Sequence, residues 1–404
     1  MLKEINSFYT KGERRYFFYN MEEAEEQAVA VLLIERGSMS ENHDEKGLSH
    51  FLEHISLGFD KFNPDQRIKC SGFTDFYYTY FMFVIEVQLL EECLDRIEKI
   101  ISGKYFEKNT FDDIKKDVIK EYEDTINCIQ TKEFARLLED TEYMEHLAIG
   151  DLEVIQTCGF YKLQDFHKKN YKEANINIIV MGNGIAENKL KRHTEYAQLV
   201  SGAKRKNIFH SFPQNEFKWL NVADKVGMSV YFYRKRKKLN KSQYIKENIL
   251  DEICFSLFET VVSEMYEGTK ASLNKIIFSS SDEFIGIHLK NCCISNKIEL
   301  KRVLHQIVER VDASHIRAFF LKFKKEYNDS CRFGYKINLI DETKRCIRNL
   351  IYDGFMLGNK EIIKMVNLEL ELIKINEITS RFNRMINNDA DFYLYKVIDC
   401  NRNK

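Results

Sequence analysis

Residues 47–57 of the chain read Gly47-Leu48-Ser49-His50-Phe51-Leu52-Glu53-His54-Ile55-Ser56-Leu57. Successive residues of an α-helix turn by about 100°, so residues three and four positions apart share a face. On such a helix the apolar side chains gather on one face and the polar ones on the other. The apolar set is Leu48, Phe51, Leu52 and Ile55, and the polar set is His50, Glu53 and His54. The stretch therefore predicts an amphipathic helix that packs on a core and presents a compact H-x-x-E-H group.

The spacing within this polar group suits a zinc site. Two imidazoles at positions i and i+4 can bind one metal ion through their ring nitrogens, and a carboxylate just before the second histidine can reach the water on that ion. His50 and His54 are thus candidate ligands of Zn2+, and Glu53 is a candidate general base. The alternative is a surface helix with two incidental histidines, since composition alone gives such a string in roughly a few per cent of chains this long.

A catalytic zinc needs a third protein ligand and one open position for water. A helix expected over residues 109–129 offers the acids Glu121, Glu123 and Asp124. With Ile114 as the origin of its apolar stripe, Glu121 falls within about 40° of that stripe. Glu123 points to the far side and Asp124 to a flank. A carboxylate on an apolar stripe is costly unless it is paired or bound to a metal, which favours Glu121 as the third ligand and leaves a structural salt bridge as the alternative.

The charge balance of the chain excludes several classes of protein. Its 404 residues include 61 lysines and arginines against 62 aspartates and glutamates. A nucleic-acid or anionic-membrane binder normally has a basic excess, so we expect neither partner. Apolar runs such as residues 28–34 and 80–85 have strand length and are far shorter than the roughly 18 residues of a membrane span.

The N-terminus and the cysteines indicate a cellular compartment. Residues 1–20 carry six charged side chains and no long apolar segment, so we expect no signal peptide. The ten cysteines are scattered and include no C-x-x-C pair, which excludes a zinc ribbon and a regular disulfide framework. We therefore expect a reducing, cytoplasmic location.

The periodicity along the chain predicts mixed strands and helices. Strands are indicated at residues 28–34, 76–87, 176–180, 227–233 and 284–289, and helices at residues 89–101, 109–129 and from residue 300 onward. Residues 199–214 interrupt all periodicity. We predict an α+β protein of two tandem, similar domains, each a mixed sheet packed with helices: residues 1–198 with the zinc motif, a linker at 199–215, and residues 216–404 without a zinc motif.

A basic run, residues 234–238, follows the aromatic residues 231–233. It can be interpreted as a phosphate-binding patch with stacking aromatics. Because the chain has no net basic charge, a solvated segment between a strand and a loop is the favoured interpretation. In both interpretations the basic run can attract an acidic peptide.

These residues resemble the start of an M16 (pitrilysin-type, inverzincin) metallopeptidase domain. The resemblance rests on Gly37-Ser38, Glu41 and residues 47–54, continues through residues 117–121 and 149–155, and covers most of residues 28–184. It implies that His50, His54 and Glu121 are the zinc ligands and that Glu53 is the general base. It also implies that residues 1–198 form a peptidase domain that hydrolyses peptides.

The stretch between the zinc helix and the third ligand departs from the family pattern. The interval from His54 to Glu121 is shorter than usual, and the shortening falls between residues 57 and 79. In that stretch the family has an edge strand that pairs with the substrate backbone. Here only residues 71–74 can stand in its place, so Gly72 and Thr74 are candidate residues of a substrate edge strand.

Two expected side chains are replaced or missing. The family places a supporting acid seven residues before the third ligand, where this chain has Ile114, and Asp117 is the substitute that we expect next to the metal ligands. The family also supplies a substrate-holding arginine from its C-terminal domain. No arginine occurs between Arg236 and Arg302.

The resemblance therefore implies a zinc endopeptidase subunit that works as a homodimer or as a heterodimer with a related M16 chain. Small bacterial members of the family often process ribosomally made peptides, so the maturation of such a peptide is the narrower expectation. The alternative is a non-catalytic M16-like interaction subunit that completes the chamber of a partner peptidase. The H-x-x-E-H group favours the first hypothesis, and the missing arginine favours the second.

Overall fold

The computed structural model describes most of the chain. The described residues are 7–11, 14–20, 26–61, 67–139, 141–183, 195–196, 218–221, 227–267, 269–279, 282–290, 297–332, 338–355, 357–386 and 392–399. The predicted linker, residues 199–215, lies outside them. No helix among the described residues is long and apolar enough to cross a membrane.

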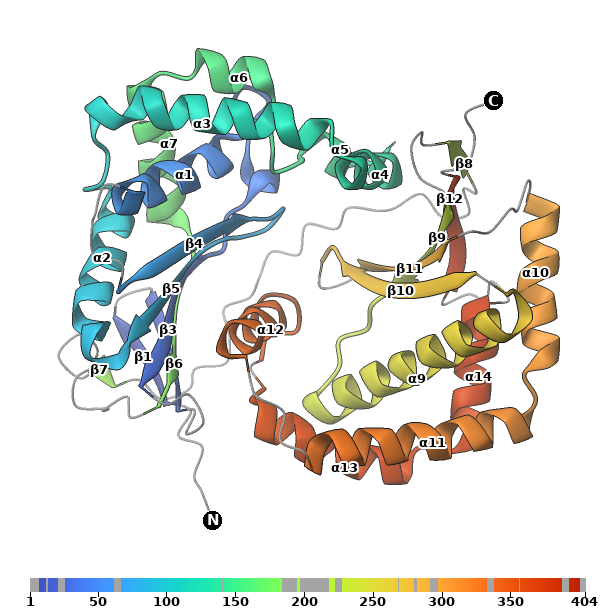
Figure 1. The fold of residues 1–404 in the computed structure, drawn as a ribbon. Helices are drawn as coiled ribbons and strands as arrows, with labels where there is room; N and C mark the ends of the chain where they lie inside the picture. The colour runs from blue at the N-terminus through green and yellow to red at the C-terminus, as the bar shows by residue number, and fades with distance from the viewer. Residues whose placement is uncertain are drawn as a thin grey trace. The chain divides into compact units, whose positions relative to one another are not determined.

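The chain divides into two compact units, and each of them combines one sheet with helices (Figure 1). Unit 1 comprises residues 1–128, 140–207 and 337–351, and unit 2 comprises residues 129–139, 208–336 and 352–404. The predicted α+β class is confirmed, since strands and helices build both units.

Unit 1 is built on a seven-stranded sheet in the order β4-β5-β3-β6-β2-β1-β7. The strands are β1 (Ser7–Lys11), β2 (Arg14–Asn20), β3 (Gln27–Ile34), β4 (Lys69–Thr74), β5 (Thr79–Glu86), β6 (Ile176–Gly182) and β7 (Glu195–Tyr196). The β2–β6 pair is parallel, and the other pairs are antiparallel. The unbroken apolar run of β3 is buried on both faces, as expected for a central strand. β4 stands at one end of the order.

Helices cover this sheet. They are α1 (Leu48–Lys61), α2 (Leu90–Ser102), α3 (Lys108–Ile126), α5 (Glu142–Glu145), α6 (Leu152–Thr157), α7 (Phe160–Glu173) and α12 (Leu339–Tyr352). The apolar face predicted for α1 is confirmed, because its four apolar side chains are at most 3% exposed. α2 ends at Gly103, whose φ of 70° is the left-handed conformation that glycine adopts at low cost.

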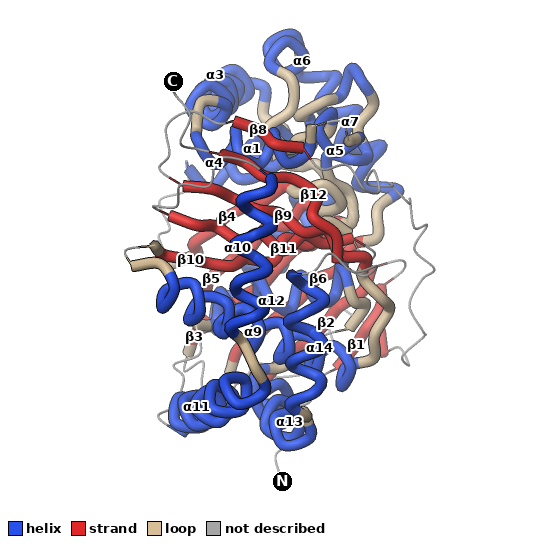
Figure 2. The backbone as a smooth tube through the Cα atoms, turned by 90° about the vertical axis from the view of Figure 1, so that its right-hand side faces the viewer, coloured by secondary structure: helices blue, strands red, loops and turns tan. Residues whose placement is uncertain are grey.

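Unit 2 is built on a five-stranded sheet in the order β10-β11-β9-β12-β8 (Figure 2). The strands are β8 (Lys218–Asn221), β9 (Gly227–Lys235), β10 (Lys270–Ile277), β11 (Asp282–Lys290) and β12 (Phe392–Asp399). The helices are α4 (Ile129–Leu138), α9 (Lys241–Met265), α10 (Lys297–Arg310), α11 (Ala313–Arg332), α13 (Asn359–Leu372) and α14 (Ile375–Ile386). Asn240 and Gln243 begin α9 with a capping box.

Helix α12 belongs to unit 1, although it comes late in the chain. Thr343 Oγ1, which donates to the Leu339 carbonyl of its own helix, lies 3.4 Å from Met181 Sδ on β6. Ile178 and Val180 lie in the core shared with α1, so by strand alternation Met181 faces the opposite side of the sheet. α12 therefore packs on the face away from α1.

Helix α4 belongs to unit 2, although it directly follows α3. Tyr231 donates to the buried carboxylate of Glu133 at 2.9 Å, and Ser229 donates to the same oxygen. Both donors come from β9. The predicted division of the chain at residues 199–215 does not include the assignment of α12 to unit 1 or of α4 to unit 2. Periodicity shows which face of a helix is buried, but it does not show which sheet that face packs against.

Candidate metal centre

Three side chains of unit 1 converge at the polar face of α1. His50 Nε2 and His54 Nε2 lie 3.1 Å apart. Glu121 on α3 reaches both rings, with 3.6 Å from Oε1 to His50 Nε2 and 3.1 Å from Oε2 to His54 Nε2. Each residue offers one ligand atom, and these atoms lie within 4.8 Å of one another. Among the described residues this is the one such group of three or more candidate ligands.

Close packing between α1 and α3 allows this convergence. A Cβ at Gly58 would lie 3.1 Å from Ile114 Cγ1, so the side chain of Ile114 fills the space over Gly58. One helical turn before Ile114 on α3, the ring of Phe111 packs against that of Phe51 on α1, with the ring centroids 5.3 Å apart. Ile114, which replaces the acid of the family pattern, thus serves the contact between the two helices.

The geometry fits a zinc ion. Zinc binds nitrogen and oxygen ligands at about 2.0–2.2 Å, so neighbouring ligands on a tetrahedron lie about 3.3–3.6 Å apart. The observed separations of 3.1, 3.1 and 3.6 Å are close to these values. Two imidazoles and one carboxylate are also a donor set of catalytic zinc sites. His50 Nδ1 is buried and has no hydrogen-bond partner in the protein. In metal sites this second ring nitrogen is usually held by a carboxylate, a carbonyl or a water.

The electrostatics of the group favour a positive charge. Burial lowers the pKa of His50, but the carboxylates of Glu121, Glu53 and Glu41 outweigh this effect and raise it overall. The acids around His50 thus create a negative potential at its ring. A divalent cation would satisfy the same potential.

Glu53 lies beside the group without joining it. Glu53 is 5% exposed, and Thr74 on β4 donates a hydrogen bond to its Oε2 at 2.7 Å. Burial raises the pKa of Glu53, against the opposing effects of His50 and the Thr74 hydroxyl. A carboxylate that is held in place and readily accepts a proton suits a general base.

The candidate edge strand lies against Glu53. A Cβ at Gly72 would come within 2.6 Å of Glu53 Cγ and 2.7 Å of Cδ, so only glycine fits at this position of β4. Thr74 is buried, and its hydroxyl is engaged with Glu53. The structure thus places Gly72 and Thr74 on the face of β4 that supports Glu53.

Gly72→Ala should lower peptide hydrolysis about a hundredfold and leave zinc content unchanged. The added methyl group must displace the Glu53 carboxylate, and a misplacement of about 1 Å can cost this much in rate. Gly159→Ala is the matched control, since nothing lies within 4 Å of its Cβ position. Hydrolysis rates and metal analysis of both variants test the contact, and a fully active Gly72→Ala enzyme would contradict it.

The exposure of Glu121 differs from expectation. Its side chain is 45% exposed, because it lies nearly one turn past Val118, the last buried residue of the stripe. Asp117 is exposed and is not one of the three ligand residues, and its expected place next to them stays a prediction. The stripe thus predicts the direction of Glu121 correctly but not its burial.

Glu41 has a role that was not predicted from its residue type. It accepts hydrogen bonds from the backbone nitrogens of Gly47 at 2.8 Å and Ser49 at 2.6 Å, at the start of α1. Burial raises its pKa to about 7, although these two bonds oppose the shift. Glu41 thereby anchors the helix that carries the histidines. An acid a few residues before the glycine that begins a helix is a signal that could have indicated this role.

The opposite face of β4 carries an aromatic surface. Phe73 is 46% exposed, and its ring lies 5.6 Å from that of Tyr80 and 6.3 Å from that of Tyr78. Burial and Glu53 raise the pKa of Tyr80, whereas Arg348 lowers it. Arg348 lies exposed on α12, late in the sequence, and its positive charge favours the ionised form of Tyr80.

Residues 16–151 match the family model described as "Insulinase (Peptidase family M16)". Within these residues the chain is similar to peptidase family M16. All four residues of the candidate site lie within the match. The resemblance named from the sequence is thus confirmed.

Proteins named as zinc proteases are found among the sequence relatives. The chain is 21% identical over 402 residues to a "Probable zinc protease PqqL" of Haemophilus influenzae, which covers 90% of this chain and 42% of the relative. It is 23% identical over 177 residues to a "Zinc protease PQQL-like" of Arabidopsis thaliana, which covers 39% of this chain and 18% of the relative. The chain thus spans less than half the length of these curated relatives.

Solved structures share the fold over the whole chain. The first half of the periplasmic protease PqqL from Escherichia coli superposes with a TM-score of 0.79 and 14% identity, covering 99% of this chain and 92% of that one. A protease from Helicobacter pylori gives a TM-score of 0.70 and 14% identity, covering 98% and 99%. Both units therefore adopt the M16-like α+β fold.

Proposed function

We propose that the chain is the zinc-bearing part of an M16 peptidase that hydrolyses internal bonds of peptides. The convergence of His50, His54 and Glu121 beside the held carboxylate of Glu53 carries this proposal. The zinc proteases among its relatives support it.

His50, His54 and Glu121 would hold the zinc ion. When bound, zinc supplies a Lewis acid that polarises the scissile carbonyl and makes water more acidic. Glu53 takes the proton of the attacking water on Oε1, while Thr74 fixes Oε2 and so sets the direction of the carboxylate. Glu53 then returns the proton to the leaving amine. Asp117, which is exposed, has at most an indirect part in this scheme.

The substrate would bind as an extended peptide along β4, which stands at the end of the sheet order. Side chains of an added strand alternate between the two faces. One face leads to Glu53 and the other to Phe73 and Tyr80, so apolar residues at alternate positions would suit this edge. Maturation of a ribosomally made peptide is the narrower form of the proposal, and it rests on the family resemblance.

We further propose that activity requires a second M16 chain. Of the two expected partners, a relative is favoured over a copy of this chain, because a copy would lack the same arginine. The observation behind the pairing is the absence of arginine from residue 237 to residue 301, the region where the family supplies a cation for the substrate. The fold matches one half of the PqqL protease, which supports the pairing. The proposed location is cytoplasmic, and the buried thiols Cys93, Cys158 and Cys254 support a reducing compartment.

The purified chain should bind zinc but cleave peptides slowly, and a related M16 chain should raise the rate about a hundredfold. A cation acting where negative charge develops typically contributes at least this much. Cleavage time courses with and without the second chain, combined with light scattering, measure the effect. The second chain should carry a substitution of its own general base wherever it has one, so that any turnover comes from Glu53.

Two outcomes decide against this pairing. Full activity of the monomer, unchanged by the second chain, would show that the site is complete; loss of that activity in Arg348→Gln would then assign the cation to α12. In a separate mixture with a second chain whose own general base is intact, turnover that persists when Glu53 is replaced would instead favour the alternative, a non-catalytic subunit that completes a partner's chamber.

A further inference from the structure

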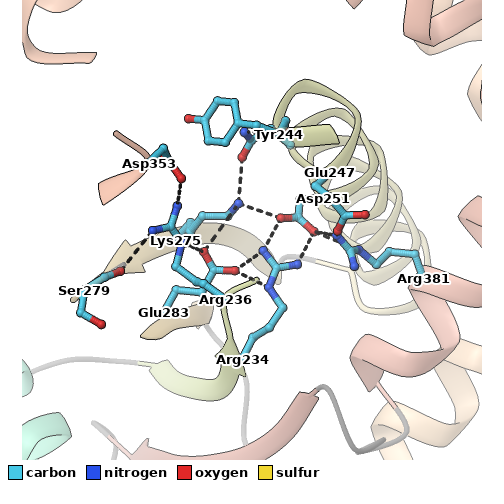
Figure 3. Close-up of polar contacts among 11 residues, drawn as sticks. Arg234, Arg236, Tyr244, Glu247, Asp251, Lys275, Ser279, Glu283, Asp353 and Arg381 are labelled. Carbon is cyan, nitrogen blue, oxygen red and sulfur yellow. Dashed lines mark hydrogen bonds and ion pairs between the residues drawn. The ribbon is translucent and has the colours of Figure 1, made fainter. Parts of the chain in front are cut away.

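The basic run at residues 234–238 is partly buried, which corrects the prediction of a solvated segment. Arg234 lies at the end of β9 and is 7% exposed. Its guanidinium forms a two-pronged pair with Asp251 on α9, at 2.7 Å from Nη1 to Oδ1 and 2.6 Å from Nη2 to Oδ2, and it also contacts Glu283 on β11 (Figure 3). Lys275 on β10 contacts Asp251 at 2.7 Å. These pairs join β9, β10 and β11 to α9, so the cluster has a structural role in unit 2.

A different kind of contact, between two glycines of unit 1, lies at the start of α1. Gly47 directly precedes α1, Gly150 lies two residues before α6, and their φ angles are 93° and 76°. A Cβ at Gly150 would overlap Gly47 Cα and would lie 2.6 Å from Gly47 N and 2.8 Å from Lys46 O. All three atoms belong to the backbone, so no side chain can turn away to make room. The left-handed φ and the lack of space therefore both require glycine at position 150.

Hydrogen bonds fix the glycine contact on both sides. Asp151 N donates to Lys46 O at 3.3 Å, and the Asp151 carboxylate caps the start of α6. On the other side, Gly47 O accepts from Phe51 N at 2.9 Å, which is the first hydrogen bond of α1. The start of α6 is thereby joined to the start of the helix that carries the two histidines.

Residues 143–151, named here the clamp segment, lead to Gly150 and hold the start of α1 at a second point. His146 Nδ1 lies 3.0 Å from Ser38 O. The same oxygen accepts from Glu41 N at 3.1 Å, and the Glu41 carboxylate holds the backbone nitrogens of Gly47 and Ser49. The clamp segment thus reaches α1 directly through Gly150 and indirectly through the loop that contains Glu41.

A third contact of the clamp segment reaches the turn between β4 and β5. The hydroxyls of Tyr143 and Tyr77 lie 2.7 Å apart, and the Tyr143 ring packs edge-on against Phe76 with the ring centroids 4.9 Å apart. Phe76 and Tyr77 follow β4, the strand from which Thr74 donates to Glu53. The clamp segment therefore contacts both the helix of the histidines and the turn beside the strand that supports the candidate base.

The position of α1 decides the geometry of the metal centre. His50 is the third residue of α1, so it lies in the helical turn that follows Gly47. Glu121 comes from α3, and its oxygens lie 3.6 Å from His50 Nε2 and 3.1 Å from His54 Nε2. Because the groups of such a site must be held within about 0.5 Å of their working geometry, a small shift of α1 against α3 would disturb the ligand set.

We propose that the clamp segment positions α1 for metal binding and that Gly150 is its central positioning residue. Gly150 acts through Gly47 and the first turn of α1, and not by contact with the metal or the substrate. The inference rests on the proposed zinc peptidase function, because it concerns the ligands of that site. It adds a positioning element that lies outside both α1 and α3.

Gly150→Ala should weaken zinc binding about 10–100-fold, the loss typical of a group that orients a metal ligand. The added methyl group must displace the backbone at Gly47 and with it the first turn of α1. Competition with a chromophoric chelator, well below the melting temperature of the variant, measures the affinity. The visible absorption of cobalt(II) bound in place of zinc reports the coordination geometry, and its bands should change. Neither measurement depends on hydrolysis.

Two further variants accompany this test. Gly103→Ala is the matched control for general destabilisation, since Gly103 also has a left-handed φ of 70° and its Cβ would lie 2.9 Å from His167 Cε1. Because Gly103 ends α2, its variant should melt at a lower temperature but bind zinc as the wild type does. His146→Ala adds no bulk and removes one hydrogen bond, so it should fold and should weaken zinc binding about two- to tenfold.

A folded Gly150→Ala with the wild-type affinity and cobalt spectrum would overturn the proposal, and so would an equal loss of affinity in Gly103→Ala. If Gly150→Ala does not fold, wild-type affinity in His146→Ala overturns it instead. A wild type that binds zinc but hydrolyses no peptide, alone or with a second M16 chain, would contradict the proposed peptidase and leave the role of the clamp segment standing. A wild type that binds no metal would overturn both.

Discussion

Glutamine in place of Glu53 should lower peptide hydrolysis by about two to four orders of magnitude and leave zinc content unchanged. The amide keeps the size of the side chain and can still accept the hydrogen bond from Thr74, but it cannot take up a proton from water. Because Glu53 lies outside the group of ligand atoms, the metal should stay in place.

Single-turnover cleavage of a peptide and elemental analysis of the same preparation test both parts of this expectation. Glu91→Gln, an exposed acid on α2, is the control for the loss of one negative charge and should behave like the wild type. If Glu53→Gln loses its zinc, Glu53 is a ligand rather than the base. Substantial remaining hydrolysis would remove it from the chemistry altogether.

His50→Ala and Glu121→Gln should each lower zinc affinity by more than a hundredfold. Two protein ligands remain in each variant where a catalytic zinc needs three, and even the loss of a group that only orients a ligand costs about 10–100-fold. Zinc content after dialysis, followed by competition with a chromophoric chelator, measures the affinity.

Each of these variants has a matched control. Glu123 is an exposed acid of the same helix as Glu121, so Glu123→Gln should retain the metal. His305 on α10 is 69% exposed, and His305→Ala should also retain it. Equal zinc in His50→Ala and His305→Ala would mean that the metal, if bound, lies elsewhere.

Local periodicity was sufficient to predict the elements that carry the ligands. The helical spacing of apolar and polar residues in α1 places His50 and His54 on one face. The apolar stripe of α3 indicates that Glu121 lies on the buried side of its helix. These relations need only the geometry of single helices. The family motif added the pairing of α1 with α3, which periodicity alone does not give.

Contacts between distant segments were not predictable in this way. The sequence around each residue does not show that Thr74 on β4 donates a hydrogen bond to Glu53, or that Arg348 lowers the pKa of Tyr80. The burial of Arg234 was missed for the same reason, since its partners Asp251 and Glu283 are distant in sequence and come together only when β9, β11 and α9 assemble. The net charge describes the chain as a whole and does not show whether opposite charges are clustered locally.

The exchange of α4 and α12 between the two units has a consequence for how the polypeptide matures during synthesis. Unit 1 includes residues 337–351, so its sheet cannot acquire the cover of α12 until most of the chain has left the ribosome. The strands and helices that surround the zinc motif emerge first and must wait with the face that bears Met181 still unprotected. A chaperone, or a pause before release, would therefore matter more here than for two domains joined end to end, where the first can finish before the second begins.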